Sequence, residues 1–338
     1  MRIFGIILLL LTACSKPEGF VDSAYFPDDF PAVANNQLIE NSQIVRLGRQ
    51  LFFEKALSAN GKVSCGSCHL IEKSFTDGEA LSAIGISGVR LGRHSPALIN
   101  LAYMNSGLFW DGGAKNLESL IFAPLTHPDE MAADLKKVEM FLKADDQYAE
   151  SLKSAFGVEE VRIQYAAKAI AQFLRTLVSD QSKYDSVRRK QLIFNEMEQK
   201  GYLIFKENCS GCHQEPLLTD NSYHNNGLDT AFSIENESLF SGRYRISHDE
   251  ADIGKFKTPT LRNIALTAPY MHDGRFESLQ EVLEHYASGI KNSATLAGEL
   301  KNEESSGFNY TAEEKEQLKA FLLTLTDYNF IKIHKKEL

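Results

Sequence analysis

The sequence predicts an all-α fold of two helical domains connected by long loops. Several segments repeat apolar residues at the three- and four-residue spacing of one helix face, and none sustains the alternation of a β-strand. The 338 residues are about twice the usual ~150 of one domain. With 43% hydrophobic residues, the composition is that of a globular protein and argues against a disordered, collagen-like or coiled-coil chain.

The chain opens with a segment typical of an export signal. One positive charge, Arg2, precedes an apolar run over residues 3–11, which is too short to span a bilayer but suits the core of a signal peptide. The run ends in Leu11-Thr12-Ala13-Cys14, which is similar to the end of a bacterial lipoprotein signal, although a chance cysteine in an ordinary signal peptide would look the same. We expect residues 1–14 to form the signal segment, with Cys14 lipidated and the membrane contacted only through this anchor.

The helical pattern recurs in five segments along the rest of the chain. They cover residues 42–55, 161–177, 191–207 and 276–286, and a final helix that begins at the capping box Thr311-x-x-Glu314. Residues 214–257 are rich in Asn, Ser, Asp and Gly, which predicts long loops. Because residues 182–190 are strongly polar, we expect two domains, over residues 23–185 and 186–338.

Each predicted domain contains one Cys-x-x-Cys-His motif. Residues 65–69 read Cys-Gly-Ser-Cys-His, and residues 209–213 read Cys-Ser-Gly-Cys-His. In such a motif both thiols can form thioethers with the vinyl groups of one haem, and the adjoining histidine can reach the iron. The motifs therefore predict two covalently bound c-type haems. Their expected attachment and proximal residues are Cys65, Cys68 and His69 for the first and Cys209, Cys212 and His213 for the second.

Other readings of the cysteines are weaker. The halves of a zinc ribbon lie roughly 15–20 residues apart and carry no adjoining histidine, whereas these two motifs are far apart and both carry one. A thioredoxin-type redox pair would follow a strand, and the residues before Cys65 are helical and then loop-like. The odd total of five cysteines excludes a fully paired disulfide framework, and the net charge of −9 argues against nucleic acid as a partner.

Seven further motifs, in order along the chain, make it resemble the bacterial di-haem cytochrome c peroxidase and MauG family. They are Leu47-Gly48-Arg49-Gln50-Leu51-Phe52-Phe53, Phe75-Thr76-Asp77-Gly78, Arg93-His94-Ser95-Pro96, Phe109-Trp110-Asp111-Gly112, Pro128-Asp129-Glu130-Met131, Thr258-Pro259-Thr260-Leu261-Arg262-Asn263 and Ala268-Pro269-Tyr270-Met271-His272-Asp273-Gly274. The resemblance implies two cytochrome-c-like domains, an N-terminal one in which peroxide reacts and a C-terminal one that transfers electrons.

The resemblance also implies an activity. Such an enzyme reduces hydrogen peroxide to water with electrons from a protein donor, most simply a small cytochrome c, on the periplasmic side of the bacterial envelope. One alternative is a MauG-like enzyme that uses peroxide to oxidise side chains of a partner protein. A second alternative is a non-catalytic di-haem electron carrier.

Three positions around the first haem follow from the resemblance. Glu130 matches the family's acid–base glutamate, although taken alone it reads as a solvated charge near a helix start. Trp110 matches a residue between the haems that relays electrons, although a core aromatic is the ordinary reading. Ile86 stands where classical members place a histidine that blocks the first iron, so we expect this haem to be five-coordinate and to react without prior reduction.

The far side of the second haem has three candidate ligands. Tyr286 aligns with the tyrosine of MauG-like proteins, where peroxidases fed by small cytochromes carry a methionine. A phenolate favours the ferric state, as in catalase, and a thioether raises the potential. The alternative is that Tyr286 is a core aromatic and that Met271 or His285 binds the iron instead.

A calcium ion between the domains is also implied by the resemblance. The carbonyl groups of Thr267 and Pro269 match family ligands, but His94 replaces the asparagine that supplies a side-chain ligand. Because calcium prefers oxygen ligands, this replacement weakens the site.

Overall fold

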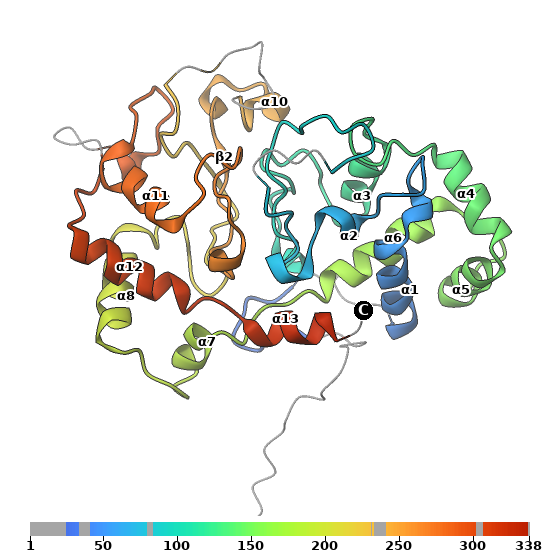
Figure 1. The fold of residues 1–338 in the computed structure, drawn as a ribbon, viewed down its shortest axis with the longest axis horizontal. Helices are drawn as coiled ribbons and strands as arrows, with labels where there is room; N and C mark the ends of the chain where they lie inside the picture. The colour runs from blue at the N-terminus through green and yellow to red at the C-terminus, as the bar shows by residue number, and fades with distance from the viewer. Residues whose placement is uncertain are drawn as a thin grey trace, which may run out of the picture.

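The computed structural model describes residues 25–33, 41–79, 84–230, 232, 241–301 and 307–336. The predicted signal segment and Cys14 lie outside these residues. The molecule is mainly helical, with an N-terminal half on the right of Figure 1 and a C-terminal half on the left. The only sheet in the described part is an antiparallel pair, β1 (Tyr223–His224) with β2 (Phe256–Lys257). The predicted all-α class is confirmed.

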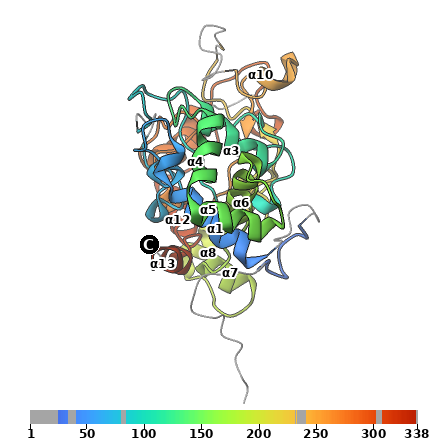
Figure 2. The ribbon, with the colours of Figure 1, turned by 90° about the vertical axis from the view of Figure 1, so that its right-hand side faces the viewer.

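The N-terminal half is built around the crossing of two helices. Its elements are α1 (Ser42–Phe53), η2 (Lys55–Leu57), α2 (Cys65–Cys68), η3 (Ile71–Lys73), η4 (Leu101–Tyr103), α3 (Leu117–Thr126), α4 (Leu135–Ala144), α5 (Asp146–Phe156) and α6 (Ile163–Arg175). Helix α1 begins where Asn41 accepts a hydrogen bond from the Ile44 amide. A Cβ atom on Gly48 would lie 1.8 Å from the Ala169 carbonyl oxygen, so only glycine lets α1 and α6 approach this closely. Figure 2 views this half from outside, with α4 and α5 towards the viewer.

The C-terminal half repeats this construction. Its elements are α7 (Lys183–Arg188), α8 (Glu196–Asn208), β1, α10 (Tyr244–Ser247), η6 (Glu250–Asp252), β2, η7 (Ile264–Leu266), α11 (Leu279–Glu284), the π-helical turn η8 (His285–Gly289), η9 (Gly298–Leu300), α12 (Ala312–Leu323) and α13 (Tyr328–Lys335). A Cβ atom on Gly201 would lie 1.9 Å from the Gln317 carbonyl oxygen where α8 crosses α12. The predicted capping box is present, with Thr311 and Glu314 bonded reciprocally.

The apolar core consists of two main clusters, one in each half. The first includes Phe52 and Phe173, whose ring centroids lie 5.3 Å apart, and the second includes Phe205 and Phe321, at 4.9 Å. Phe330 of α13 belongs to the first cluster, so the C-terminal helix packs against the N-terminal half. The division at residues 185 and 186 stays a prediction.

A buried polar joint holds the segment between the halves. The Arg262 guanidinium is 1% exposed and donates to both carboxylate oxygens of Asp185, at 2.9 and 2.8 Å, and to the Ser179 carbonyl. Asp327, before α13, accepts from the backbone amides of Asp180 and Gln181 at 3.1 and 2.8 Å. The bonds to Ser179, Asp180 and Gln181 tie the segment after α6 to the C-terminal half, and the Arg262–Asp185 pair lies within that half.

Candidate haem sites

The first Cys-x-x-Cys-His motif forms one short helix followed by an oriented histidine. Helix α2 runs from Cys65 to Cys68 and places both thiols one turn apart. The Nδ1 atom of His69 lies 2.7 Å from the Phe75 carbonyl oxygen. Because a carbonyl only accepts, Nδ1 carries the proton and Nε2 keeps the lone pair that a metal requires.

The second motif has the same arrangement. Cys209 follows the last residue of α8, and the Nδ1 atom of His213 donates to the Leu218 carbonyl oxygen at 3.1 Å. Cys65, Cys68, Cys209 and Cys212 are all free thiols, and burial raises the pKa of Cys65 and Cys209 to about 12. Each motif thus offers two unpaired, partly buried thiols beside an imidazole that is oriented through its Nδ1, which fits covalent attachment of one haem.

Glu130 lies beside the first motif. Burial is the main cause of the raised pKa of Cys68, and the charges of Asp77 and Glu130 add to it. Burial also raises the pKa of Glu130 itself, against the opposing influence of His127, whose Nδ1 lies 3.8 Å from its Oε1. A carboxylate with a raised pKa next to the expected haem has the properties of a proton carrier.

The loop that carries Ile86 packs on the same segment. The Ile86 amide donates to the Glu130 carbonyl oxygen at 2.8 Å. A Cβ atom on Gly85 would lie 1.8 Å from the Asp129 carbonyl oxygen, so the loop backbone lies against this segment. The structure therefore brings Ile86 and Glu130 together, as a shared pocket requires.

Trp110 lies at the junction of the two halves. Its indole Nε1 donates to the His94 carbonyl oxygen at 2.8 Å, and its own carbonyl accepts from the Lys257 amide of β2 at 2.8 Å. The next residue, Asp111, is buried and accepts from Arg93 at 2.8 Å and from Arg245 at 2.7 Å. The tryptophan is therefore held between both halves by hydrogen bonds on either side.

Tyr286 and Met271 meet near the second motif. The Asn226 amide nitrogen lies 3.5 Å from the Tyr286 hydroxyl and 3.4 Å from the Met271 sulfur. Burial raises the pKa of Tyr286 to about 12, and the nearby Cys209 and Cys212 thiols contribute to this rise. His285 instead donates from Nε2 to the Asn226 carbonyl oxygen at 3.0 Å. His285 and Tyr286 are the first two residues of the π-helical turn and reach different atoms of Asn226. Such π-helical turns are often found at functional sites.

Of the residues matched to a calcium site, His94 already has hydrogen-bond partners. Both ring nitrogens of His94 are bonded, Nδ1 to the Glu79 carbonyl at 2.7 Å and Nε2 to the Thr76 hydroxyl at 3.2 Å. Thr267 and Pro269 lie in the C-terminal half, around the cis peptide bond that precedes Pro269. The calcium site stays a prediction that depends on these carbonyl groups.

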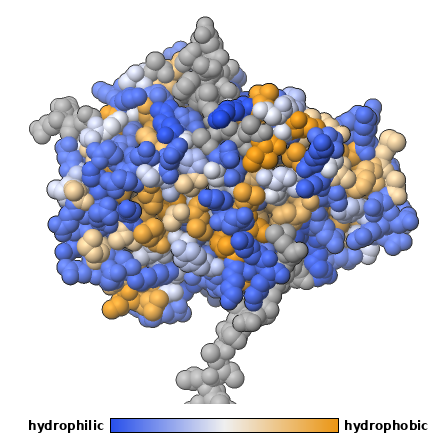
Figure 3. Space-filling view, viewed as in Figure 1, coloured by the Kyte–Doolittle hydropathy of each residue, from blue (hydrophilic) through white to orange (hydrophobic). Residues whose placement is uncertain are grey.

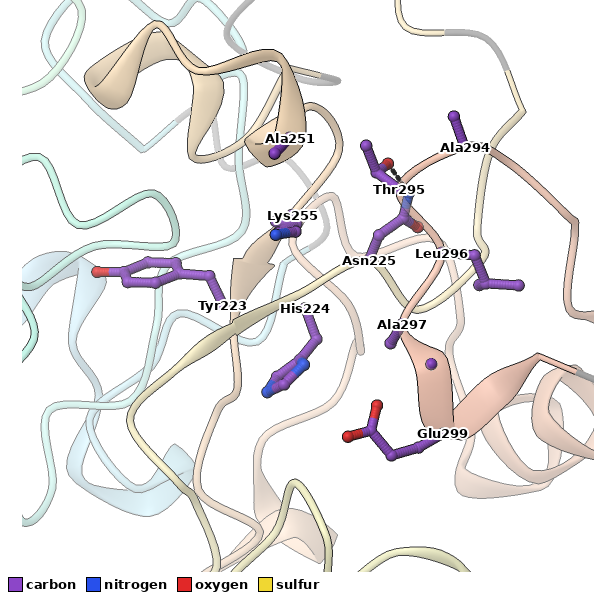
Figure 4. A pocket seen from close by; sticks show the side chains of 11 residues that line it. Tyr223, His224, Asn225, Ala251, Lys255, Ala294, Thr295, Leu296, Ala297 and Glu299 are labelled. Carbon is purple, nitrogen blue, oxygen red and sulfur yellow. Dashed lines mark hydrogen bonds between the residues drawn. The ribbon is translucent and has the colours of Figure 1, made fainter.

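A pocket of about 430 Å³ lies beside the second motif (Figure 4). Its lining residues are Tyr223, His224, Asn225, Ala251, Lys255, Ala294, Thr295, Leu296, Ala297, Gly298 and Glu299. His224 donates from Nε2 to Asp220 at 2.7 Å, and ligand atoms of His224, Glu299 and Cys212 lie within 4.8 Å of one another. Among the described residues this is the only such trio, and a thioether at Cys212 would leave it one imidazole and one carboxylate. No sequence signal pairs His224 with Glu299, because β1 and η9 are distant in the chain.

Two helical halves, each with one complete Cys-x-x-Cys-His site, define a di-haem c-type protein. A family model described as di-haem cytochrome c peroxidase matches residues 42–192. Cytochrome c551 peroxidase of Nitrosomonas europaea is 36% identical over 85% of this chain and 81% of its own, and the methylamine utilization protein MauG of Methylorubrum extorquens is 35% identical over 88% and 82%. The chain belongs to the di-haem cytochrome c peroxidase and MauG family.

Solved structures agree with this assignment. A MauG-like protein associated with microbial copper homeostasis superposes with a TM-score of 0.81 at 32% identity, covering 90% of this chain and 96% of that one. The diheme peroxidase BthA from Burkholderia thailandensis, at 23% identity and a TM-score of 0.71, shares the fold over 85% of this chain and 87% of its own. Membership implies two c-type haems and a peroxidase-type oxidoreductase. In the described part of the chain, no helix is long and apolar enough to cross a membrane.

Proposed function

We propose that the protein reduces hydrogen peroxide to two water molecules, consuming two electrons from a protein donor and two protons. Cys65, Cys68 and His69 would hold the haem where peroxide reacts, and Cys209, Cys212 and His213 the haem that receives electrons. The observation that carries the proposal is Glu130, a carboxyl group with a raised pKa beside the first motif.

Glu130, Ile86 and Trp110 each have a separate role in this reaction. When bound, the first haem supplies the peroxide-binding position and the redox chemistry. Glu130 takes the proton from one peroxide oxygen and returns it to the other, and burial, which raises its pKa, favours its protonated form in the second step. Ile86, which lies against the Glu130 segment, offers no ligand atom and leaves room for peroxide. Trp110 offers an aromatic route for electrons between the halves.

The donor would approach at the pocket beside Cys212. Two of its lining residues, His224 and Glu299, have ligand atoms within 4.8 Å of the Cys212 sulfur, which would attach the second haem, so an electron has a short path from the pocket. The net charge of −9 favours a basic donor, such as a small basic cytochrome c. The N-terminal peroxidatic domain over residues 23–185 and the electron-transfer domain over 186–338 belong to the same proposal. The same proposal includes a calcium ion bound at Thr267 and Pro269 and a lipid anchor at Cys14 on the periplasmic side.

A second candidate is MauG-like oxidation of a partner protein. Two observations favour it: Ile86 stands at the blocking position, and the Tyr286 hydroxyl, whose pKa is affected by the nearby Cys209 and Cys212 thiols, accepts from Asn226. A phenolate at the second haem disfavours reduction by an ordinary cytochrome, whereas Met271 would favour it.

Steady-state turnover separates these candidates. The holoprotein is mixed with peroxide and reduced small basic cytochrome c, and the oxidation of the cytochrome is followed. We expect two cytochromes oxidised per peroxide. Peroxide loss without cytochrome oxidation would favour the MauG-like candidate, and no peroxide loss with any donor would contradict both and leave an electron carrier.

A further inference from the structure

An exposed apolar patch lies at the lower edge of the C-terminal half. It consists of Leu192, Ile193 and Met197, whose side chains are 52%, 85% and 41% exposed, and we name it the α7–α8 patch. Ile193 is the most exposed large apolar side chain among the described residues. An apolar area gathers at the lower left of Figure 3, below α7 and α8 as seen in Figure 1.

The fold holds this patch outwards. The amides of Gln191 and Leu192 both donate to the Ser186 carbonyl oxygen of α7, at 2.8 and 3.3 Å. Phe194, the next residue after Ile193, is buried in the second core cluster, and Asn195 then caps α8. The loop is thus pinned at both ends, so the exposure of Ile193 is a feature of the fold and not of a loose segment.

The N-terminal segment of the described chain passes next to the patch. Asp29 accepts from Arg188 at 3.2 Å and from Arg189 at 2.9 Å, at the end of α7, directly before the patch. Tyr25 donates to Asp180 at 3.0 Å. The chain between Cys14 and Tyr25 can span at most roughly 40 Å, at about 3.6 Å per residue. A lipid on Cys14 therefore limits the distance between the membrane and Tyr25 to that length.

We propose that the α7–α8 patch is a second membrane contact, inserting Leu192 and Ile193 into the lipid interface beside the anchor. The proposal rests on the proposed lipidation of Cys14, which supplies the high local concentration that a small patch needs. Lys190 is exposed and adjoins the apolar side chains, and a cation at this place favours anionic headgroups.

This contact has a consequence for electron donation. In Figures 1 and 2, α10 lies at the end of the molecule opposite α7. The pocket beside Cys212 is lined by Ala251 and Lys255, which are close to α10 in the chain. A molecule seated on the α7–α8 patch therefore holds the α10 end away from the membrane, where a soluble donor can approach it.

A spin label tests the contact directly. If the five native cysteines carry the lipid and the haems, Ile193→Cys introduces the only free thiol, and a nitroxide is attached there. Met140→Cys is the matched control, because Met140 on α4 is 67% exposed in the other half. The lipidated holoproteins are bound to vesicles of phosphatidylethanolamine and phosphatidylglycerol, and accessibility to oxygen and to a water-soluble nickel chelate is measured by electron paramagnetic resonance.

On vesicles, we expect the label at position 193 to gain oxygen accessibility and to lose nickel accessibility, while the label at position 140 is unchanged. A label at 193 that stays as accessible to nickel as in solution overturns the contact. A holoprotein that does not bind vesicles lacks the anchor and also overturns it. Peroxide turnover of the same samples reports separately on the proposed function, so failure of the contact and failure of the activity are distinguishable.

Discussion

Replacing Glu130 by glutamine keeps the size of the side chain but removes the group that is proposed to carry the proton. Loss of a positioned acid–base group lowers a rate by roughly 10²–10⁴, or about 2.7–5.5 kcal/mol at about 1.36 kcal/mol per tenfold. The His127 side chain, whose Nδ1 lies 3.8 Å from the Glu130 Oε1 and which is 47% exposed, is a polar group that can take over part of this role. We therefore expect kcat/KM for peroxide to fall by about 10²–10³, the lower part of that range.

The assay is stopped-flow reaction of the holoprotein with peroxide, after the absorbance of both haems has been shown to match that of the unaltered protein. Asp129→Asn is the control, because it removes the neighbouring carboxylate and leaves Glu130 in place. A Glu130→Gln variant that reacts as fast as the control would refute the proposed role.

The proposed role of Glu130 also predicts how the reaction rate changes with pH. Burial, with the charge of Asp129, raises the pKa of Glu130, and His127 lowers it. Glu130 can accept the peroxide proton only when it is ionised, so the rate falls as pH drops through its pKa. We expect this limb of the kcat/KM profile to move to lower pH in Asp129→Asn and to higher pH in His127→Gln. A limb that moves in neither variant would assign the titration to another group.

Three further substitutions are predicted together. Tyr286→Phe should change the absorption of the second haem and raise its potential by on the order of 0.1 V, within the roughly 0.8 V that axial ligands span, and unchanged spectra would point to another ligand. Arg262→Ala should lower the unfolding free energy by about 3–5 kcal/mol, because the Asp185 carboxylate is left buried and unpaired. Burial opposes ionisation of Asp185, yet Arg262 holds the pKa of this carboxyl below its usual value. The stabilisation by this pair is therefore present at neutral pH and is lost on acidification. If denaturant titrations of the variant and the unaltered protein differ equally at low and neutral pH, this explanation is wrong. Gly201→Ala should cost about 1–3 kcal/mol or more by overpacking the crossing of α8 and α12, whereas Gly298→Ala, which meets nothing within 4 Å, should be neutral in the same titrations.

Local signals in the sequence predicted the elements that depend on local chemistry. The predicted helix at 42–55 is α1, the Thr311 capping box opens α12, and the predicted helix at 276–286 appears as α11 and its π-helical turn. The predicted helix at 191–207 begins later, at Glu196, because Asn195 caps it. Leu192 and Ile193, which fall inside the predicted range, lie on the surface before the helix.

Contacts between distant segments were out of reach of the sequence. Helix α13 returns to the N-terminal core through Phe330, and Asp327, which caps this helix, also bonds the connecting segment; neither of these long-range contacts has a local signal. The approach of His224 and Glu299 to Cys212 depends on two loops that meet only in the folded molecule. In the same way, the sequence named Tyr286 and Met271 as alternatives, and only the fold brings both to Asn226.

The most direct test of the account is peroxide addition to the diferric holoprotein, without any reductant, followed by stopped-flow absorbance. Because Ile86 stands at the blocking position and lies against the Glu130 segment, we expect an immediate spectral change with loss of peroxide. A change that persists would favour the MauG-like candidate over the cytochrome-fed one. A holoprotein that responds only after one electron has been added would contradict an open first site.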